Sequence, residues 1–521
     1  MTTLSTDSLD WAIEHLHRYG DTNIFPKSFE IDAVRHCWDA EGRRLSKQNV
    51  AQWATRPLRR CLVPKSRYGF RVATQLDPLD AILYTSLVWE VGESIEGRRI
   101  PASDHVVFSH RFAPDNAGLR FFDQQWNFGK FQSHSEELAK RHPVVVVTDI
   151  ADFFPRIYLH RLEGALTTVL GSSPAHAKAI LHMIKSWNQN VSYGLPVGSN
   201  PSRLLAELVI DDIDRSLLSD GVTFCRFVDD YRIFCDSPQE AHERLAGLAN
   251  LLLQTHGLTL NHQKTDVIDS EEFIRTRIQT EGRRELSALA DGFEDLVSQL
   301  DLDSPYEDID YDDLPEEVQG EIDGLNLEGL LDEQLERDDV DISMCKFLLN
   351  RLGQLNRTDP LTDVLSETEK LYPVFAEIIR YVGRVRESLS PGERRCVGKR
   401  LMGLLQGSIV SHLEFHRALT LMVFADSGDW GCRDMIAPLY DTYGDQWSRR
   451  SAVLALGRYG QDFWFRARKQ SFDQLPPWER RAFIRGASCL PPDERRHWVR
   501  AIRPRLDDLE KCVVQWATAG P

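Results

Sequence analysis

The stretch that decides the fold is FCRFVDDYRIF, residues Phe224–Phe234. Aromatic and β-branched residues fill its two halves, Phe224–Val228 and Tyr231–Phe234, and residues of these kinds favour β-strands. The adjacent aspartates Asp229 and Asp230 lie between the halves, and Asp is a common turn residue. The stretch therefore predicts a β-hairpin with two carboxylates at its tip. Taken alone, such a tip is more often a solvated turn than a site of chemistry.

A further carboxylate follows a second strand-like stretch, VVVVTDIADFF at residues 144–154. Four consecutive valines are typical of a buried central strand, and Asp149 lies where that strand would end. Carboxylates at the ends of adjacent strands repel one another unless a cation lies between them. Carboxylate oxygens suit Mg²⁺, which keeps coordination positions open for water and phosphate. The two stretches together predict a divalent-metal site.

Five blocks, in chain order, resemble the motifs of reverse transcriptases. The block at 149–154 resembles motif A, that at 227–230 resembles motif C, Gly194–Ser202 with the helical run Leu204–Ile213 resembles motif B, Gly257–Thr265 resembles motif D, and Pro64–Arg71 resembles the basic fingers segment. The resemblance covers residues 60–270 and implies an α+β fold with a right-hand polymerase palm and fingers.

The resemblance implies roles for residues of the metal site. Asp149, Asp229 and Asp230 would bind two Mg²⁺ ions, with Mn²⁺ as an alternative, and Ile150 would add its backbone carbonyl. One ion would activate the primer 3′-hydroxyl, and the other would hold the triphosphate. Lys264 would protonate the leaving pyrophosphate, although a lone lysine after a strand is normally a solvated surface residue.

Four further residues are expected at the nucleotide. Lys65 and Arg71 would grip the triphosphate, because a point charge and a planar fork together neutralise it. Phe154 occupies the position of the family's steric gate, where a ring beneath the sugar excludes a 2′-hydroxyl and favours deoxynucleotides. Its neighbour Phe153 is expected in the core. Gly198 would supply the backbone freedom for close approach to the nascent base pair.

One position departs from the family pattern. Many reverse transcriptases have Gln between the Pro and the Gly of motif B, whereas this chain has Val197. The change removes a polar contact to the incoming nucleotide or the template. Unusual template use is therefore left open, while polymerisation itself is still expected.

Composition favours a soluble globular protein, with 42% hydrophobic and 27% charged residues. The net charge of −17 is unusual for a nucleic-acid enzyme, but residues 291–341 alone contribute −20, which leaves the remaining chain at +3. A basic groove is therefore still compatible with the composition, since phosphate binding needs only a local field. The nine cysteines show no zinc spacing, and neither a signal-peptide pattern nor a membrane-length apolar run is present, so the prediction is a cytoplasmic protein with no membrane contact.

The predicted organisation has five segments. They are an N-terminal helical segment (1–55), fingers (56–142), a palm with motifs A to D (143–290), an acidic linker or short helices (291–341) and an all-α, HEAT-like helical-repeat domain (342–521). Local patterns predict helices over residues 8–20 and from Asp77, and short strands at Ser109–Phe112 and Leu258–Leu260.

The repeat prediction rests on an internal echo. WSRR at residues 447–450 recurs as WERR at residues 478–481, and such recurrence is typical of stacked helix pairs. Two interpretations of the arginines stay open. They form ion pairs between repeats, or they line a basic surface for the emerging nucleic acid.

A palm and fingers followed by helical repeats resembles the antiviral, abortive-infection branch of bacterial reverse transcriptases. The resemblance implies an RNA-directed DNA polymerase in phage defence that uses dNTPs and an RNA or DNA template-primer. Further expected partners are a non-coding RNA, a defence protein or a second copy of the chain.

Three alternatives stay open. The first is a template-independent polymerase primed by a protein hydroxyl, for which nothing selects among Tyr68, Tyr193, Tyr231 and Tyr311. The second is a retron or group II intron reverse transcriptase; the lack of a Cys/His cluster near the C-terminus argues against the intron type. The third is a palm-fold module that binds nucleic acid or a phage protein without catalysis, and the presence of Asp149 together with the Asp229–Asp230 pair argues against it.

Overall fold

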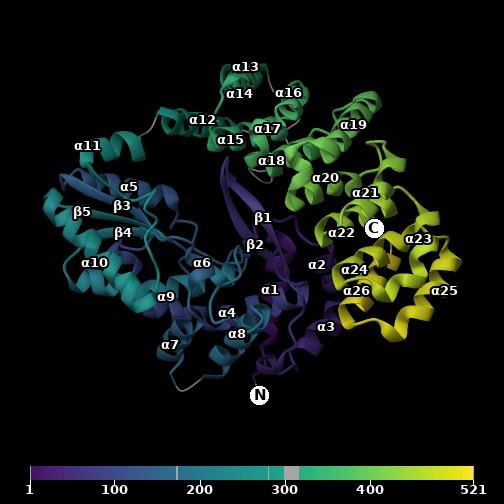
Figure 1. The fold of residues 1–521 in the computed structure, drawn as a ribbon, viewed down its shortest axis with the longest axis horizontal. Helices are drawn as coiled ribbons and strands as arrows, with labels where there is room; N and C mark the ends of the chain where they lie inside the picture. The colour runs from purple at the N-terminus through teal and green to yellow at the C-terminus, as the bar shows by residue number, and fades with distance from the viewer. Residues whose placement is uncertain (1, 172–173, 280, 299–315, 520–521) are drawn as a thin grey trace. The chain divides into compact units, whose positions relative to one another are not determined.

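The computed structural model describes residues 2–171, 174–279, 281–298 and 316–519 of the chain (Figure 1). The chain forms two compact units. Unit 1 comprises Met1–Arg60 and Ala73–Thr280, and unit 2 comprises Cys61–Val72 and Glu281–Pro521. Among the described residues, no helix is both long and apolar enough to cross a bilayer.

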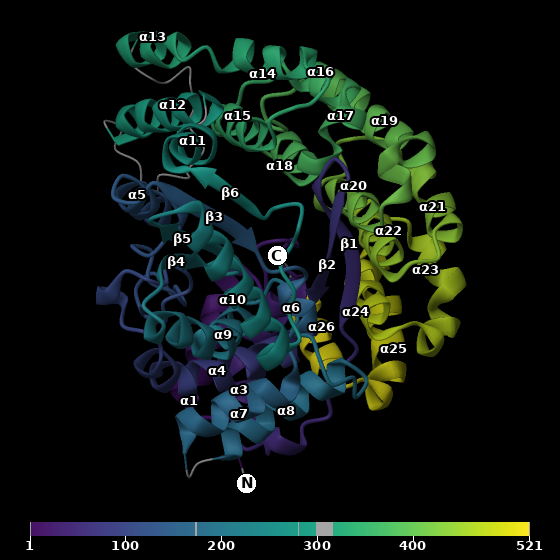
Figure 2. The ribbon, with the colours of Figure 1, turned by 60° about the vertical axis from the view of Figure 1, so that its left-hand side comes forward.

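Unit 1 contains a four-stranded antiparallel sheet in the order β4-β5-β3-β6 (Figure 2). The strands are β3 (Val144–Asp149), β4 (Thr223–Phe227), β5 (Asp230–Cys235) and β6 (Asp266–Asp269). The prediction of a central valine-rich strand is confirmed, because β3 pairs with β5 on one side and β6 on the other. The predicted hairpin is also confirmed, as β4 and β5 are joined by the turn Val228–Asp229.

Helices surround the sheet in unit 1. They are α1 (Thr6–Tyr19), α2 (Phe29–His36), α3 (Trp38–Leu45), α4 (Pro78–Arg98), α5 (Phe128–Ala139), α6 (Phe153–Arg156), α7 (Leu159–Leu170), α8 (Pro174–Trp187), α9 (Asn200–Ser219), α10 (Pro238–His256) and α11 (Ser270–Phe273). Some of these helices start at capping signals in the sequence: Ser5 caps α1, and Asp77 caps α4 with Pro78 in the first turn.

The core beneath the sheet is formed by apolar side chains from the strands and from α5. Val145, Cys225 and Phe234 of the sheet pack against Phe131 of α5 and against Phe108. Burial of these rings and aliphatic groups stabilises the sheet. It also fixes the strand ends that carry the acidic residues.

Two strand predictions in unit 1 are wrong. Residues 109–112 contain an isolated bridge from Phe112 to Phe122 and no strand. The backbone there takes other partners, because Arg99 donates to the carbonyl groups of Ser109 and His110 at 2.9 and 2.7 Å. Residues 258–260 likewise form only an isolated bridge from Leu260 to Ile150, and the outer strand is β6.

Unit 2 combines a β-hairpin segment with helices. The hairpin strands are β1 (Arg59–Ser66) and β2 (Gly69–Gln75), and residues 61–72 of the hairpin belong to unit 2. Its tip packs within the unit, because Arg67 Nη1 donates to the backbone carbonyl of Asp338 at 2.9 Å. Arg67 and Tyr68 also line a cavity of about 480 Å³ with residues 339–343.

The helices of unit 2 follow one another without an intervening strand in the part that the structure describes. They are α12 (Glu281–Ser298), α13 (Glu316–Gly324), α14 (Leu327–Glu336), α15 (Ile342–Gln354), α16 (Leu361–Ser366), α17 (Thr368–Leu371), α18 (Phe375–Arg384), α19 (Pro391–Gly407), α20 (Glu414–Asp426), α21 (Ile436–Thr442), α22 (Gln446–Arg458), α23 (Asp462–Arg468), α24 (Pro477–Gly486), α25 (Pro492–Ile502) and α26 (Asp508–Ala519).

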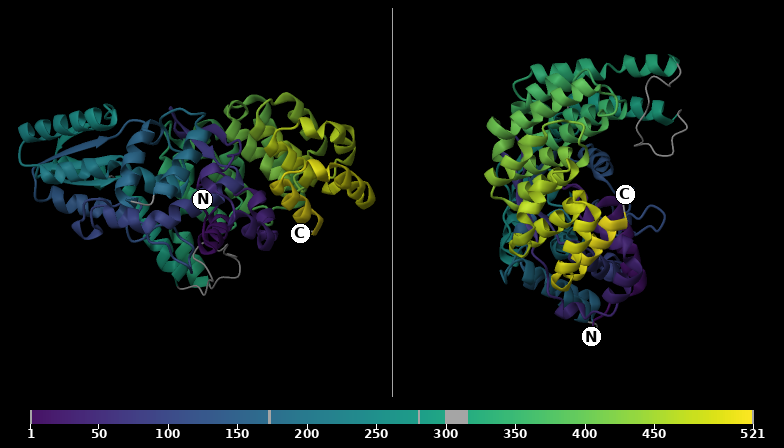
Figure 3. Two further views of the ribbon diagram at one scale, coloured as in Figure 1. Left: turned by 90° about the horizontal axis from the view of Figure 1, so that it is seen from below. Right: turned by 90° about the vertical axis from the view of Figure 1, so that its right-hand side faces the viewer.

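Alternate helices near the C-terminus pack in series, α20 against α22, α22 against α24 and α24 against α26 (Figure 3). Arginine side chains connect the helices of these packed pairs. Arg417 of α20 donates to Asp445 at the start of α22 at 2.7 Å, and Arg480 of α24 donates to Glu510 of α26 at 3.0 Å. At these positions the arginines join neighbouring helices.

The structure describes part of the acidic stretch 291–341. Residues 299–315 lie outside the described residues. The described remainder is largely helical, and α14 buries Leu327, Leu331 and Leu335 along one face. This spacing of four residues explains how so acidic a segment forms a helix, since one stripe is apolar.

Candidate active site

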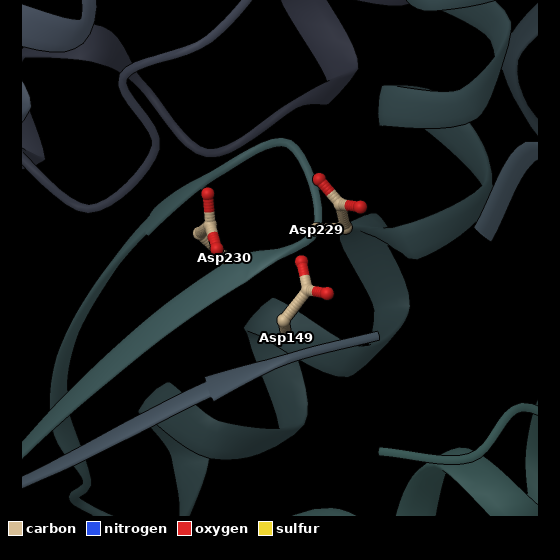
Figure 4. A group of neighbouring side chains, drawn as sticks. All are labelled: Asp149, Asp229 and Asp230. Atoms are coloured by element: carbon tan, nitrogen blue, oxygen red, sulfur yellow. The ribbon is translucent and has the colours of Figure 1, made fainter. Parts of the chain in front are cut away.

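Three aspartates meet where β3 ends and β5 begins. Asp149 is the last residue of β3, Asp230 is the first residue of β5, and the two are paired across the sheet. Asp229 lies in the turn before β5. Figure 4 shows the Asp149 carboxylate directed toward the end of the hairpin that carries Asp229 and Asp230. Ligand oxygens from all three lie within 4.8 Å of one another, so the group is suited to a divalent cation.

The backbone ties the two strand ends together. The amide of Ile150 donates to the carbonyl of Asp229 at 3.0 Å, and the amide of Asn261 donates to the carbonyl of Asp149 at 2.7 Å. Asn261 belongs to the predicted motif D, so motifs A, C and D converge at one point in unit 1. The carbonyl of Ile150 as a metal ligand stays a prediction.

Lys264 supplies a cation beside the acidic group. Its Nζ lies 2.8 Å from Oδ2 of Asp149. Partial burial acts to lower the pKa of Lys264, but the hydrogen bond and charge of Asp149 outweigh it and raise the pKa above its ordinary value. The lysine is therefore protonated when it contacts the carboxylate.

The pKa of Asp230 is also raised, which for a carboxyl group favours the neutral form. Burial and the nearby Asp149 carboxylate raise the pKa of Asp230 above its ordinary value. Two carboxylates in contact favour sharing a proton or binding a cation. Three hard oxygen donors at one strand edge are ligands that fit Mg²⁺ or Mn²⁺.

The turn at Val228 has an unusual backbone conformation. Val228 has a φ of 58°, in the left-handed region that a β-branched residue rarely adopts. This conformation costs about 1–3 kcal/mol and persists only where neighbouring groups hold it. The turn positions Asp229, so the strain is located directly beside the acidic group.

The two phenylalanines after motif A lie in different environments. Phe153 is 3% exposed, as expected for a core residue, whereas Phe154 is half-buried. The backbone carbonyl of Phe154 accepts from the amide of Leu195 at 3.0 Å. Motif A is thereby joined to the motif B loop, and the gate role of Phe154 stays a prediction.

Gly198 adopts a φ of 118°, which a side chain would oppose. A Cβ at this position would lie 3.0 Å from Cγ2 of Thr22. The close neighbour in this structure is therefore the N-terminal segment of the chain itself. Contact of Gly198 with a nucleotide stays a prediction.

Lys65 and Arg71 belong to the other unit. Both are exposed on the hairpin β1–β2, within the residues assigned to unit 2. Unit 1 thus brings together Asp149, Asp229, Asp230 and Lys264, while the triphosphate-binding role of the two hairpin cations stays a prediction.

A buried charge network behind the turn was not predicted from the sequence. Arg226 Nε lies 2.9 Å from Oδ1 of Asp214, and its Nη2 lies 3.0 Å from Oε2 of Glu207. Arg99 Nη2 also lies 3.0 Å from Glu207. Burial acts to raise the pKa of Glu207, but the charges of Arg226 and Arg99 outweigh it and hold the pKa well below its ordinary value.

The missed signal was the spacing of acids in α9. Glu207, Asp211 and Asp214 recur at intervals of four and three residues among apolar residues, and all three are buried. Acids on an apolar helical face require buried cationic partners. This rule points to arginines elsewhere, although the sequence does not say which ones.

Comparison with known proteins supports the motif assignment. Residues 108–278 match the family described as reverse transcriptase (RNA-dependent DNA polymerase). Retron Mx65 reverse transcriptase from Myxococcus xanthus is 30% identical over 140 residues, which is 24% of this chain and 33% of that protein. The chain thus spans about a third of the length of this relative. Residues 108–278 form a reverse transcriptase domain, and the predicted fingers segment Pro64–Arg71 lies outside the match.

Among solved structures, telomerases were found to be similar to this chain. Telomerase from Candida albicans, in complex with a fragment of telomeric RNA, is 12% identical with a TM-score of 0.33, over 70% of this chain and 64% of that chain. Apo telomerase from Candida tropicalis is 12% identical with a TM-score of 0.32, over 72% and 71%.

Proposed function

We propose that the protein is an RNA-directed DNA polymerase that joins deoxynucleotides at Asp149, Asp229 and Asp230. The observation that carries this proposal is the convergence of three carboxylates at one strand edge inside a reverse transcriptase domain. A charged cluster of this kind is stabilised by a cation bound between the carboxylates. Phosphoryl transfer from a nucleoside triphosphate is the reaction that needs such a cation beside it.

The chain's own groups have distinct roles in this proposal. Asp149, Asp229 and Asp230 would hold two Mg²⁺ ions, which supply charge neutralisation at the primer hydroxyl and the phosphates. Lys264 carries the proton that the leaving pyrophosphate would take up. Its contact with Asp149 places this proton at the edge of the metal site.

Substrate choice follows from the neighbouring aromatic residue. Phe154 is half-buried and follows directly after the buried Phe153. A ring at this position, packed beneath the sugar, would exclude a 2′-hydroxyl by contact. DNA is therefore the proposed product.

The proposal includes a cytoplasmic role in defence against phage. Its support is the order of the chain, a reverse transcriptase domain followed by helices that pack in series, which resembles antiviral reverse transcriptases. We assign the C-terminal helices to a HEAT-like repeat on the basis of their serial packing and the recurrent arginines. Such repeats commonly bind protein or nucleic acid, so a partner protein, an RNA or a second copy of the chain is proposed there.

A retron-type reverse transcriptase is a second candidate, favoured by the 30% identity with the Myxococcus xanthus enzyme. A retron enzyme needs a structured RNA gene beside its own gene. The genomic neighbourhood and the RNA that co-purifies with the protein separate this candidate from the first.

The structure narrows the choice of a protein primer. Tyr231 is 0% exposed and donates its hydroxyl to Asp214 at 2.9 Å, so it is not available for priming. Tyr68 and Tyr193 are 85% and 51% exposed and stay open, while Tyr311 lies outside the described residues.

The template is tested with purified protein, Mg²⁺ and labelled dNTPs, with and without RNase pretreatment. The proposal predicts DNA synthesis on an RNA template-primer and its loss after RNase treatment. DNA that persists after RNase treatment and stays attached to protein would instead establish the untemplated, protein-primed alternative.

A further inference from the structure

The peptide groups of Val228 are hydrogen-bonded on both sides. The N–H of Val228 donates to Oγ of Ser109 at 2.8 Å, and its carbonyl accepts from Nη1 of Arg226 at 2.7 Å. Val228 precedes Asp229 and has the strained φ of 58°. A strained turn persists where its surroundings determine it. Ser109 and Arg226 are the groups that bind this one.

Glu207 holds both of these groups in place. The hydroxyl of Ser109 donates to Oε1 of Glu207 at 2.5 Å, and Nη2 of Arg226 lies 3.0 Å from its Oε2. The two carboxylate oxygens of one glutamate therefore orient the donor and the acceptor that bind Val228. Glu207 is 1% exposed, so no bulk solvent competes for these bonds.

The network is balanced in charge. Arg226 also contacts Asp214, Arg99 contacts both Glu207 and Glu96, and Glu96 in turn pairs with Arg111. The connected network therefore has three cations and three anions. Buried ions are tolerated when they are paired and hydrogen-bonded in this way. Asp214 additionally accepts the hydroxyl of Tyr231 at 2.9 Å, so the network also anchors the residue that follows Asp230.

We propose that Ser109 and Arg226, oriented by Glu207, are positioning residues that fix the Val228 turn so that Asp229 and Asp230 present their carboxylates to the metal. The inference rests on the proposed function for the presence of the metal, and deepens it by assigning the alignment of the metal ligands to a network outside the metal site. None of the three residues is a ligand. They act through the peptide of Val228.

The network also connects motif B with motif C. α9 starts at Asn200, directly after the motif B loop, and carries both Glu207 and Asp214. The helix that begins beside the expected nucleotide contact is therefore connected, through Ser109 and Arg226, to the turn that carries Asp229. A displacement of α9 would be transmitted to Asp229 through these hydrogen bonds.

Ser109→Ala tests the proposal, because it removes one oxygen atom and leaves the backbone intact. Ser86→Ala is the matched control. Ser86 is also fully buried, and its hydroxyl donates to the carbonyls of Ser8 and Ile82 rather than to the turn. Mn²⁺ affinity of the full-length protein is measured by electron paramagnetic resonance, together with thermal unfolding of each variant.

We expect Ser109→Ala to weaken Mn²⁺ binding about tenfold, the usual effect of removing a group that orients a metal ligand. Ser86→Ala is expected to lower the melting temperature as much as Ser109→Ala does, and to bind Mn²⁺ as the wild type does. Equal Mn²⁺ affinities for the two variants would overturn the proposal, since the role of Ser109 would then be purely structural.

A second variant distinguishes an effect of Ser109 on the alignment of the metal ligands from an effect on folding. Gly adopts a positive φ without strain, so Ser109→Ala/Val228→Gly removes the need for the support. This double variant is expected to bind Mn²⁺ more tightly than Ser109→Ala alone. A double variant that binds no more tightly would show that Ser109 does not act through the Val228 turn.

Failure of this inference is distinct from failure of the proposed function. If Asp229→Ala/Asp230→Ala retains DNA synthesis, these aspartates are not the catalytic metal site, and the proposed function, which places synthesis there, is wrong. If that variant is inactive while Ser109→Ala binds Mn²⁺ normally, the function stands and the positioning role is wrong.

Discussion

Lys264 Nζ lies 2.8 Å from Oδ2 of Asp149, so the lysine occupies one face of a carboxylate that we assign to metal binding. Asp149 is 5% exposed, and the side-chain Nδ2 of Asn261 donates to the same oxygen at 3.4 Å. A divalent ion must compete with the ammonium group for this oxygen. The lysine therefore has two effects, one on metal affinity and one on the departure of pyrophosphate.

Lys264→Met separates these effects. The loss of the competing cation should leave Mn²⁺ affinity equal to or higher than that of the wild type, while the loss of the proton donor lowers the rate of dNTP incorporation by about 10²-fold or more. Mn²⁺ titration and single-turnover incorporation are measured on the same preparation. Weaker Mn²⁺ binding would show that Lys264 supports the metal site and does not compete with it.

Phe154→Ala is expected to relax sugar selection. Removing the ring opens the space for a 2′-hydroxyl, so the ratio of ribonucleotide to deoxynucleotide incorporation should rise about tenfold or more. Phe153→Ala is the control. It removes a buried ring and should lower the free energy of unfolding by about 3–5 kcal/mol without changing the ratio. An unchanged ratio in Phe154→Ala would exclude Phe154 as the gate.

Stability should fall in mild acid because of His416 in α20. Burial lowers the pKa of His416 to about 3, its ring packs 4.6 Å from that of Phe375, and within the described part of the chain its Nδ1 has no hydrogen-bond partner. The ordinary pKa is 6.5. As the pH falls below this value, the unfolded chain takes up a proton that the folded chain does not, so stability is complete above pH 6.5 and is lost below it.

The contribution lost between pH 7.5 and pH 5.5 is about 1.4 kcal/mol. His416→Leu should therefore lose less stability over this interval than the wild type, as measured by thermal unfolding of the full-length protein at both pH values. His497→Leu, at an exposed position on α25, should follow the wild type. Identical pH dependence in His416→Leu and the wild type would contradict the assignment.

Arg417→Ala should destabilise the helical series of unit 2. The side chain donates to Ser448, Asp445 and the carbonyl of Ser411 at 2.7–3.0 Å and is 11% exposed. Loss of charge-assisted hydrogen bonds at a mostly buried site costs about 2 kcal/mol. Arg496→Ala removes an arginine that is 70% exposed and should cost below about 0.5 kcal/mol. Equal effects in thermal unfolding would argue against a structural role for Arg417.

Part of this architecture could be predicted from local sequence patterns. The four valines before Asp149 mark a strand buried on both faces, and the aromatic and β-branched residues on either side of the Asp229–Asp230 pair mark a hairpin. Both patterns follow from side-chain burial and turn chemistry along a short segment. The pairing of Asp149 with Asp230 then follows once the two strands are neighbours.

Other features depend on contacts between distant segments. The segment at Ser109 has strand-like composition, but Arg99 binds its backbone carbonyls and no strand forms. The arginine partners of Glu207, Arg99 and Arg226, are likewise 108 and 19 positions away in the chain. The assignment of residues 61–72 to unit 2 depends on packing against helices far along the chain. Such pairings are set by tertiary structure, which local propensity does not encode.

The most direct test compares the wild type with Asp229→Ala/Asp230→Ala in the incorporation of labelled dNTPs with Mg²⁺ and an RNA template-primer. Circular dichroism confirms that both proteins are folded. The account predicts labelled DNA from the wild type, none from the double variant, and loss of the wild-type product when EDTA removes the metal. Incorporation by the double variant at the wild-type rate would contradict the assignment of these aspartates as the catalytic metal site.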